Sequence, residues 1–272
     1  MTGYVQGRID GRSARVPRGT TILEAARSLG LAIPTLCHHE GLPPEGNCRL
    51  CLVEMDGRLA ASCMFPLRSN DFEIFTDSET VLRARRFVLE LLVNRCPRSP
   101  RLLALAREYN VKPDPRFMTV DEQLSPNSAE PFGHHPGSAG VKPLLGPEDG
   151  GQLCIRCGRC VRACEINGPA AISLVGRGYK RQVTGPFFRP PEDCVGCRAC
   201  AVVCPTGAIT YTEKGGRRSI WNRDFELIPC ESCGKPFATA EELKRVRQAA
   251  VCQDCRRKFF GADLKAALIF DR

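Results

Sequence analysis

The stretch Cys154-Ile-Arg-Cys-Gly-Arg-Cys-Val-Arg-Ala-Cys164 decides the fold, because a second copy follows forty residues later as Cys194-Val-Gly-Cys-Arg-Ala-Cys-Ala-Val-Val-Cys204. Both copies space their cysteines as Cys-x2-Cys-x2-Cys-x3-Cys, and the similarity continues from residues 168–172 to residues 206–209. An internal repeat of this kind predicts two copies of one small structural unit. Cysteines two residues apart have the spacing of metal sites, so each copy is expected to bind a metal centre.

The spacing within each copy is the one that bacterial two-cluster ferredoxins use for two [4Fe–4S] clusters. The first three thiolates bind one cluster from a loop, whereas the fourth lies on the following helix and binds the other cluster. The ligands predicted for the first cluster are Cys154, Cys157, Cys160 and Cys204. The ligands predicted for the second cluster are Cys194, Cys197, Cys200 and Cys164. A pair of zinc sites is the alternative, but zinc has no use for eight cysteines in crossed order.

A second set of cysteines lies near the N-terminus, at Cys37, Cys48, Cys51 and Cys63. Its spacing differs from the Cys-x4-Cys-x2-Cys of plant-type ferredoxins, but it still supplies four thiolates, three of them from one loop region. On a small α/β module this set suits a [2Fe–2S] cluster; zinc and free thiols are the alternatives. A Rieske site would use His38 and His39, but four cysteines are available, so both histidines are interpreted as loop residues.

The first part of the chain shows the element order of a β-grasp module. A hairpin turn at Asp10-Gly11 is expected to join two strands. Thr20 or Thr21 is expected to cap a helix, with Glu24 placed for a capping box. The strands are expected over residues 4–9, 13–16, 49–54 and 72–75.

Two helices are expected to follow, over residues 79–93 and 101–109. The apolar face of the first helix is predicted to consist of Val81, Leu82, Val88, Leu91 and Leu92. Cys96 lies at the end of this helix and belongs to none of the cysteine sets, so it is interpreted as a small buried apolar residue. Residues 111–150 are rich in Pro, Gly and Ser and are interpreted as a linker or extended loop.

The last cysteine set consists of two Cys-x2-Cys pairs, Cys230 with Cys233 and Cys252 with Cys255. Two pairs at this separation predict a tetrahedral zinc site. The sequence Gly234-Lys-Pro-Phe-Ala-Thr after the first pair is similar to a zinc-ribbon turn. A further iron–sulfur cluster and the absence of any metal are the alternatives. The segment could dock a partner, or it could only support the C-terminus.

The fold class is therefore predicted as α+β, built from small units. Small units can fold around metal sites although their apolar cores are thin. The expected order is a β-grasp [2Fe–2S] domain over 1–76, a helical segment over 77–125, a linker over 126–150, a ferredoxin-like domain with two [4Fe–4S] clusters over 151–212, and a zinc-ribbon-like tail over 213–272.

Composition narrows the class of protein. The N-terminal residues begin no apolar signal segment and the paired cysteines favour reduced thiols, so a soluble cytoplasmic protein is expected. No apolar run approaches the roughly 18 residues of a membrane span. The net charge of +9 comes from scattered Lys and Arg residues. This pattern favours neutralisation of thiolate clusters, or an acidic protein partner, over nucleic acid.

The order of the modules resembles a known family. The stretches Cys154-Ile-Arg-Cys-Gly-Arg-Cys and Val175-Gly-Arg-Gly178, with the helical Arg85-Arg-Phe-Val-Leu-Glu-Leu-Leu-Val93, are similar to the N-terminal region of the large iron–sulfur subunit of respiratory complex I. The small diaphorase subunit of NAD-reducing hydrogenases and the front end of iron-only hydrogenases are similar too. The resemblance covers about residues 1–212.

The resemblance implies an electron-transfer subunit. One side would face a flavin subunit that oxidises NAD(P)H, and the other a catalytic subunit such as a hydrogenase or a formate dehydrogenase. The family usually carries a further cluster motif, His-x3-Cys-x2-Cys-x5-Cys, of which this chain has only Cys96. That cluster is therefore expected to be missing. The zinc-like tail lies outside the common core and is more weakly similar to tails of hydrogenase and formate-oxidising subunits.

Three other functions compete with this one. A free-standing ferredoxin-like carrier would need no stable partner. A redox sensor that binds nucleic acid would use the tail and the positive charge, but the tail has no basic helix with base-reading residues. An enzyme in its own right would need a Gly-rich phosphate loop or a nucleophile site, and the sequence contains no convincing example of either. A non-catalytic subunit of an oxidoreductase complex is the preferred interpretation.

Overall fold

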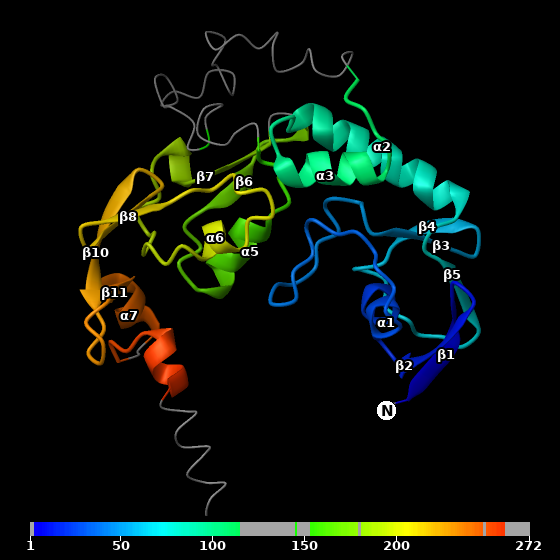
Figure 1. Cartoon of the computed structure of the whole chain (residues 1–272), viewed down its shortest axis with the longest axis horizontal. Helices are drawn as coiled ribbons and strands as arrows, with labels where there is room; N and C mark the ends of the chain where they lie inside the picture. The colour runs from blue at the N-terminus through cyan, green and yellow to red at the C-terminus, as the bar shows by residue number, and fades with distance from the viewer. Residues whose placement is uncertain (1–2, 115–144, 146–152, 179–180, 247–248, 259–272) are drawn as a thin grey trace, which may run out of the picture.

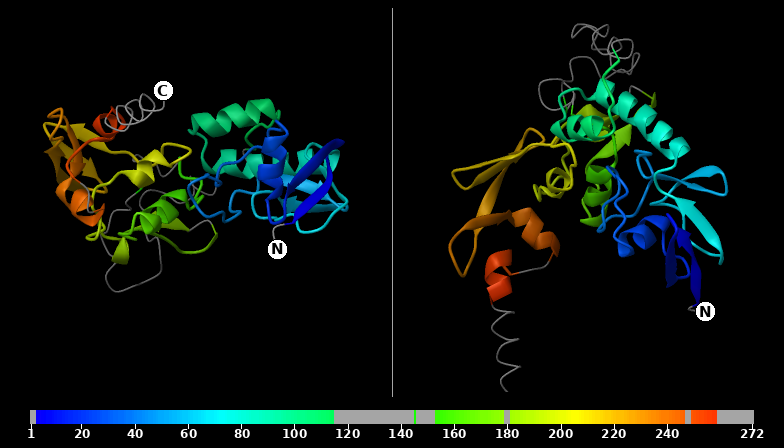
Figure 2. Two further views of the ribbon diagram at one scale, coloured as in Figure 1. Left: turned by 90° about the horizontal axis from the view of Figure 1, so that it is seen from below. Right: turned by 45° about the vertical axis from the view of Figure 1, so that its right-hand side comes forward.

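The computed structural model describes residues 3–114, 145, 153–178, 181–246 and 249–258. A five-stranded sheet lies at one end of the described chain and a four-stranded sheet at the other, with cysteine-rich loops and short helices between them (Figures 1 and 2). Apart from Leu145, the linker expected over 126–150 lies outside the described residues.

The N-terminal sheet has the strand order β2-β1-β5-β3-β4. Its strands are β1 (Tyr4–Ile9), β2 (Arg12–Pro17), β3 (Leu52–Met55), β4 (Arg58–Ala61) and β5 (Phe72–Phe75). β1 and β5 pair in parallel and the other neighbours pair antiparallel. The predicted hairpin between β1 and β2 is confirmed, because Asp10 and Gly11 both adopt the positive φ that a two-residue turn requires.

Helix α1 (Ile22–Ser28) packs on this sheet. Its predicted capping box is confirmed: the Thr21 hydroxyl accepts a bond from the Glu24 amide, and the Glu24 carboxylate accepts one from the Thr21 amide at 2.8 Å. Ile22 and Leu23 are fully buried. Burial of each side chain stabilises the module by roughly 1.5–3 kcal/mol. Helix α1 therefore begins where the sequence predicts, and the burial of its apolar side chains holds it against the sheet.

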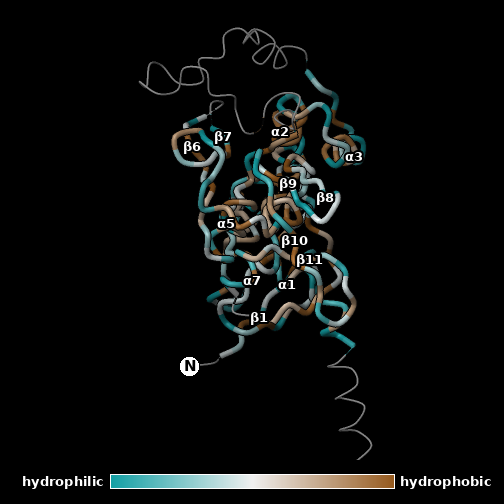
Figure 3. Tube along the Cα trace, turned by 90° about the vertical axis from the view of Figure 1, so that its left-hand side faces the viewer, coloured by the Kyte–Doolittle hydropathy of each residue, from teal (hydrophilic) through white to brown (hydrophobic). Residues whose placement is uncertain are grey.

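Helices α2 (Glu79–Arg95) and α3 (Pro100–Glu108) follow the sheet and pack against each other. Hydrophobic and hydrophilic residues alternate along both helices (Figure 3). Cys96 is completely buried at the end of α2, in the same apolar cluster as Leu102. Even α2, with 17 residues, is too short and too polar to cross a membrane, and the same holds for every other helix in the described part of the chain.

The buried face of α2 differs from the predicted one. Leu91 was expected to be buried and is 42 % exposed. Val81 is buried as predicted, but the other buried positions include Arg85, Leu89 and Val93, each four residues after the last. Arg85 can occupy this face because its guanidinium donates a 2.7 Å bond to the carbonyl of Leu52 in β3. Apolar periodicity does not predict the buried face of α2 correctly, because one of the buried positions is a hydrogen-bonded arginine.

The cysteine repeat forms two short helices beside a two-stranded antiparallel sheet. These elements are α5 (Arg159–Ile166), β6 (Ser173–Val175), β7 (Gln182–Thr184), the 3-10 turn η3 (Pro186–Phe188) and α6 (Ala199–Val202). Each helix begins directly after a cysteine loop. The residue that turns the chain into the helix is left-handed in both copies: Gly158 has φ 75° and Arg198 has φ 56°. The repeat in sequence is therefore also a repeat of backbone shape.

The tail is a four-stranded antiparallel sheet in the order β11-β10-β9-β8, followed by helix α7 and a further helical segment over residues 253–258. Its elements are β8 (Thr212–Lys214), β9 (Arg217–Ile220), β10 (Arg223–Pro229), β11 (Pro236–Thr239) and α7 (Ala240–Val246). Arg218 donates a 2.6 Å bond to the carbonyl of Gly196, and Thr239 donates one to the carbonyl of Val195. The sheet thus covers the second cysteine loop, which a detached zinc ribbon would not do.

Candidate functional site

The four N-terminal cysteines come together in a buried group beside β3 and β4. Cys37, Cys48, Cys51 and Cys63 are each at most 7 % exposed. The amide nitrogens of Cys37 and Cys48 each lie 3.4 Å from the other residue's Sγ. The Sγ atoms of Cys51 and Cys63 are 3.3 Å apart. Four soft sulfur donors in a dry setting, with backbone N–H groups aimed at two of them, fit the [2Fe–2S] cluster predicted for this set.

The thiols of this group alter one another's pKa. Hydrogen bonds with the Cys48 and Cys63 thiols lower the pKa of Cys37 to about 2, and a bond with the Cys63 thiol lowers that of Cys51 to about 6. The bond to Cys37 in turn raises the pKa of both Cys48 and Cys63. Cys37 and Cys51 are therefore the more acidic members of the set, and a bound metal would displace protons from Cys48 and Cys63.

The eight cysteines of the repeat line two separate cavities. The first cavity is lined by Cys154, Cys157, Cys160 and Cys204. The second is lined by Cys164, Cys194, Cys197 and Cys200. In each cavity three cysteines come from one copy of the repeat and the fourth comes from the other copy. The structure thus brings the cysteines together in the crossed grouping; that they bind clusters stays a prediction.

Apolar side chains form part of the wall of both cavities. Ile155, Val183 and Ile209 line the first cavity, together with the polar Arg156 and Thr206. Ile172 and Ile220 contribute to the second. A dry shell of this kind fits a cluster, because the reduction potential of a cluster depends on its exposure to solvent. Two cavities, each with four thiols and an apolar wall, fit two [4Fe–4S] groups.

Burial also raises the pKa of several thiols of the repeat. It raises the pKa of Cys154 to about 11 and the pKa of Cys157 and Cys200 to about 12. The thiolate is the form that binds metal. A cluster in these cavities would therefore replace protons on buried sulfur, and its binding energy would also stabilise the fold.

N–H donors surround the sulfur atoms of the second cavity. The Ala171 amide lies 3.2 Å from Sγ of Cys164. The Trp221 indole Nε1 lies 3.4 Å from Sγ of Cys200. Hydrogen bonds to ligand sulfur are one of the means by which a protein sets the potential of a cluster. Trp221 lies on the segment between β9 and β10, so the tail sheet supplies part of this environment.

Three residues that contact the cysteine loops were not singled out in the sequence. They are Arg162, Arg218 and Trp221, and each donates to a carbonyl or sulfur of a cysteine loop. Trp221 is the single tryptophan of the chain, but it lies well beyond the repeat. No local pattern identifies these residues, because each acts on a loop that is distant in sequence or belongs to another module.

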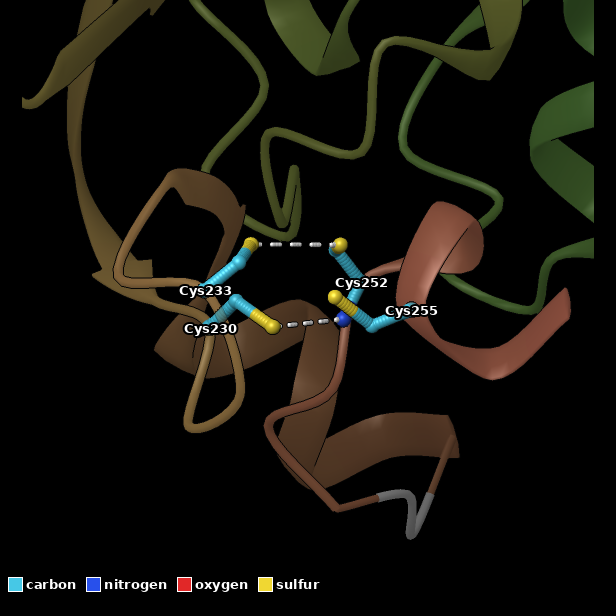
Figure 4. A group of neighbouring side chains, drawn as sticks. All are labelled: Cys230, Cys233, Cys252 and Cys255. Carbon is cyan, nitrogen blue, oxygen red and sulfur yellow. Dashed lines mark hydrogen bonds between the residues drawn. The ribbon is translucent and has the colours of Figure 1, made fainter. Parts of the chain in front are cut away.

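The C-terminal cysteines form the tightest group. The thiols of Cys230, Cys233, Cys252 and Cys255 point toward one another, with Cys233 the exposed member (Figure 4). Cys255 lies on the helical segment 253–258, and the other three lie in turns or loops. All four sulfur atoms lie within 4.8 Å of one another, and Sγ of Cys233 is 3.8 Å from Sγ of Cys252. Among the described residues no second group of histidine, cysteine or acidic ligand atoms is as compact.

The sulfur–sulfur distances of this group are compatible with a single tetrahedral metal ion. Tetrahedral zinc with Zn–S bonds of about 2.3 Å holds its sulfur ligands about 3.8 Å apart. In a [4Fe–4S] cluster each thiolate binds a different iron, so the sulfur atoms stand further apart. The Cys252 amide donates to Sγ of Cys230 at 3.3 Å and lowers the pKa of Cys230 to about 6. The group can therefore supply a thiolate without strong external activation.

Two segments of the chain match protein families of known type. Residues 4–76 match a 2Fe-2S iron-sulfur cluster binding domain, and residues 150–211 match a 4Fe-4S dicluster domain. The α+β fold class and the two kinds of cluster domain predicted from the sequence are thereby confirmed. The tail lies outside both matches, so its predicted zinc-ribbon character is not confirmed.

Known proteins are similar over about three quarters of the chain. The NADP-reducing hydrogenase subunit HndD of Solidesulfovibrio fructosivorans is 34 % identical over 215 residues, which are 75 % of this chain and 36 % of that protein. The 75 kDa subunit of NADH-ubiquinone oxidoreductase from Reclinomonas americana is 33 % identical over 214 residues, which are 74 % of this chain and 28 % of that protein. The chain thus spans about a third of the length of these relatives.

A solved structure has the same arrangement over a similar share. The crystal structure of an NAD+-reducing [NiFe]-hydrogenase in its H2-reduced state superimposes with a TM-score of 0.55 and 28 % sequence identity. The match covers 75 % of this chain and 85 % of that chain. The similarity therefore extends from sequence motifs to the three-dimensional arrangement of the modules.

Proposed function

From the premise that this chain is an iron–sulfur electron-transfer protein that resembles the N-terminal region of the large iron–sulfur subunit of complex I, we propose that it relays electrons within a multi-subunit oxidoreductase. The observation that carries the proposal is the pair of dry cavities, each lined by four cysteines in crossed order. Clusters bound there exchange single electrons, and the chain supplies their spacing, burial and hydrogen bonds.

Three ligand sets follow from this proposal. The N-terminal cysteines Cys37, Cys48, Cys51 and Cys63 hold a [2Fe–2S] cluster. The first cavity holds one [4Fe–4S] cluster through Cys154, Cys157, Cys160 and Cys204. The second cavity holds another through Cys194, Cys197, Cys200 and Cys164. The burial of the N-terminal set and the grouping of the last two sets support the assignment.

We place the chain between two partners. One is a flavin subunit that oxidises NAD(P)H, and the other is a catalytic subunit such as a hydrogenase or a formate dehydrogenase. The names of the similar proteins, an NADP-reducing hydrogenase subunit and an NAD+-reducing hydrogenase, support this choice. A reducing compartment suits thiolate ligands, so the cytoplasm is the proposed location.

The tail cysteines hold zinc in this proposal. The short distances among the four sulfur atoms support a single tetrahedral ion. Its role is structural. The zinc would hold together the end of the tail sheet, and that sheet packs on the second cysteine loop through Arg218 and Thr239. Zinc would stabilise the sheet without changing oxidation state, so it would take no part in the relay.

Metal analysis of anaerobically purified protein tests these assignments. The ligand sets predict about ten iron atoms and one zinc per chain, with separate [2Fe–2S] and [4Fe–4S] EPR signals after reduction. About fourteen iron atoms without zinc would assign a further cluster to the tail. Mostly zinc with little iron would contradict the electron-transfer function. A chain that purifies as a stable monomer with full iron would favour a free-standing carrier over a subunit.

A further inference from the structure

One arginine joins the N-terminal cysteine loop to the first cysteine loop of the repeat. Arg162 Nη2 lies 2.8 Å from the carbonyl oxygen of Cys37 and 3.3 Å from that of Cys157. Its Nη1 donates to the carbonyl of Pro43, and its Nε to that of Gly158 at 3.4 Å. A single guanidinium therefore bonds two carbonyls on each side of the contact between the modules.

The site is built to hold a buried positive charge. Arg162 is 4 % exposed, and its Nε lies 3.5 Å from the carboxylate of Glu45. Burying a charge is costly unless it is paired and hydrogen-bonded. Four carbonyls and one carboxylate meet that requirement here. The planar fork of arginine suits the arrangement, because lysine has one ammonium and cannot reach carbonyls on both loops in the same geometry.

Other contacts hold the same two loops together. The Asn47 side chain donates to the Cys157 carbonyl at 3.3 Å, and Arg159 donates to the Leu36 carbonyl at 3.3 Å. Glu45 lies so close that a Cβ on Gly158 would be 2.6 Å from its carboxylate. Because these contacts remain when Arg162 is changed, a substitution there alters the link without separating the modules.

Cys37 and Cys157 belong to the ligand sets of two different clusters in the proposed function. The backbone of each cysteine leads from its sulfur to its carbonyl, and both carbonyls accept from the same nitrogen of Arg162. The result is a continuous path of covalent bonds and hydrogen bonds from Sγ of Cys37 to Sγ of Cys157. Arginine is a cation, so a positive charge lies between the two loops.

We propose that Arg162 is the positioning residue for electron exchange between the N-terminal centre and the first centre of the repeat. This inference rests on the proposed function. Arg162 holds the two ligand loops at a fixed separation, provides the hydrogen-bonded path between them, and stabilises the reduced form of both centres by its charge. In each exchange one electron leaves one centre and enters the other; no bond breaks and no proton moves.

Variants of Arg162 and Glu45 separate these effects. R162K keeps the positive charge but loses the planar guanidinium, and R162M loses both. E45Q removes the negative charge of the neighbouring carboxylate and leaves Arg162 in place. Arg85→Lys is the matched control, because Arg85 is 3 % exposed and also donates to a carbonyl, that of Leu52, without touching the repeat. The measurements are iron content, the midpoint potentials of the centres by EPR titration, and the rate of electron exchange after laser-flash reduction.

The expected results differ among the variants. Both Arg162 variants slow the exchange several-fold and weaken the magnetic interaction between the two centres, whereas R85K changes neither. R162M lowers the two midpoint potentials because a positive charge is lost, and E45Q raises them because a negative charge is lost. A residue that only supported the fold would change thermal stability without shifting potentials in opposite directions.

Two outcomes are decisive. Wild-type exchange rate, magnetic interaction and potentials in iron-loaded R162K, R162M and E45Q would overturn the inference. If the Arg162 variants lose iron, unchanged potentials in iron-loaded E45Q would overturn it as well, since Glu45 is partly exposed and glutamine keeps the size of its side chain. Failure of the proposed function is distinct, because the wild-type protein would then lack the iron and the EPR signals.

Discussion

At the scale of single residues, the second cavity depends on a side chain far from the repeat. The Trp221 indole is buried and its Nε1 lies 3.4 Å from Sγ of Cys200. A donor at this position stabilises the more negative, reduced state of a cluster bound there. The pattern Cys-x2-Cys-x2-Cys-x3-Cys specifies the sulfur ligands, but it carries no information on which N–H groups surround them.

Trp221→Phe removes this donor and keeps an aromatic ring. We expect the midpoint potential of the second [4Fe–4S] centre to fall by up to about 60 mV. The lost hydrogen bond contributes about 0.5–1.5 kcal/mol, and for a one-electron reduction a shift of about 59 mV corresponds to a tenfold change in the equilibrium constant. Potentiometric EPR titration measures the shift. The other two centres are internal controls, and an equal shift in all three would contradict the assignment.

A glycine in the second cysteine loop carries a related constraint. Gly196 has φ 69°, and a Cβ there would lie 2.7 Å from the Phe225 ring. Gly207 has φ 68° and free space around its Cβ position. Gly196→Ala is expected to lower the free energy of unfolding by more than the roughly 1–2 kcal/mol that an alanine in the left-handed region costs. Gly207→Ala is expected to cost only that backbone strain. Thermal unfolding with iron analysis compares the pair, and equal losses would show that Phe225 moves aside freely.

At the scale of elements, the tail sheet is part of the cluster-binding half. Arg218 is 1 % exposed and bonds the Gly196 and Phe237 carbonyls, with Glu213 2.8 Å from its Nε. The buried arginine therefore connects β9, β11 and the second cysteine loop. The sequence predicted the C-terminal cysteine set but not this packing, because the two carbonyls that Arg218 bonds lie 22 residues before it and 19 residues after it.

Cys233→Ser tests the metal proposed for the tail. Removing one of four ligands is expected to reduce zinc to well below one per chain, because a structural zinc site uses all four. Iron content should stay near ten atoms, and hydrogen exchange should increase in β10, β11 and α7. Metal analysis and exchange mass spectrometry provide the readouts. Loss of about four iron atoms instead would show that the tail holds a cluster.

At the scale of the whole molecule, the two ends differ in what stabilises them. The N-terminal sheet surrounds an apolar core that includes Ile9, Ile22 and Leu23, all fully buried. The cluster of buried residues around the repeat includes three cysteines, Cys160, Cys164 and Cys200. Metal binding therefore contributes more of the folding free energy in the cysteine-rich half than in the N-terminal sheet.

Removal of all iron with a chelator under reducing conditions should expose this difference. Amide protection is expected to fall in α5 and α6 while it persists in β1, β2 and β5, because the latter strands keep their apolar core. Hydrogen-exchange mass spectrometry of the metal-free and iron-loaded chains makes the comparison. Uniform loss of protection at both ends would indicate one cooperative unit instead.

The sequence by itself determined the local features of this protein. The cysteine spacings indicated the cluster types, and Asp10-Gly11, Thr21 and Glu24 predicted the hairpin and the helix cap, because these features depend on neighbours within a few residues. Only the tertiary structure decided the roles of Arg85, Arg162, Arg218 and Trp221. Each is a buried side chain with an N–H donor whose partner lies in a segment distant in sequence, and periodicity cannot show such partners. The sequence predicted a zinc-ribbon-like tail but not that it covers the second cysteine loop, because long-range hydrogen bonds place it there.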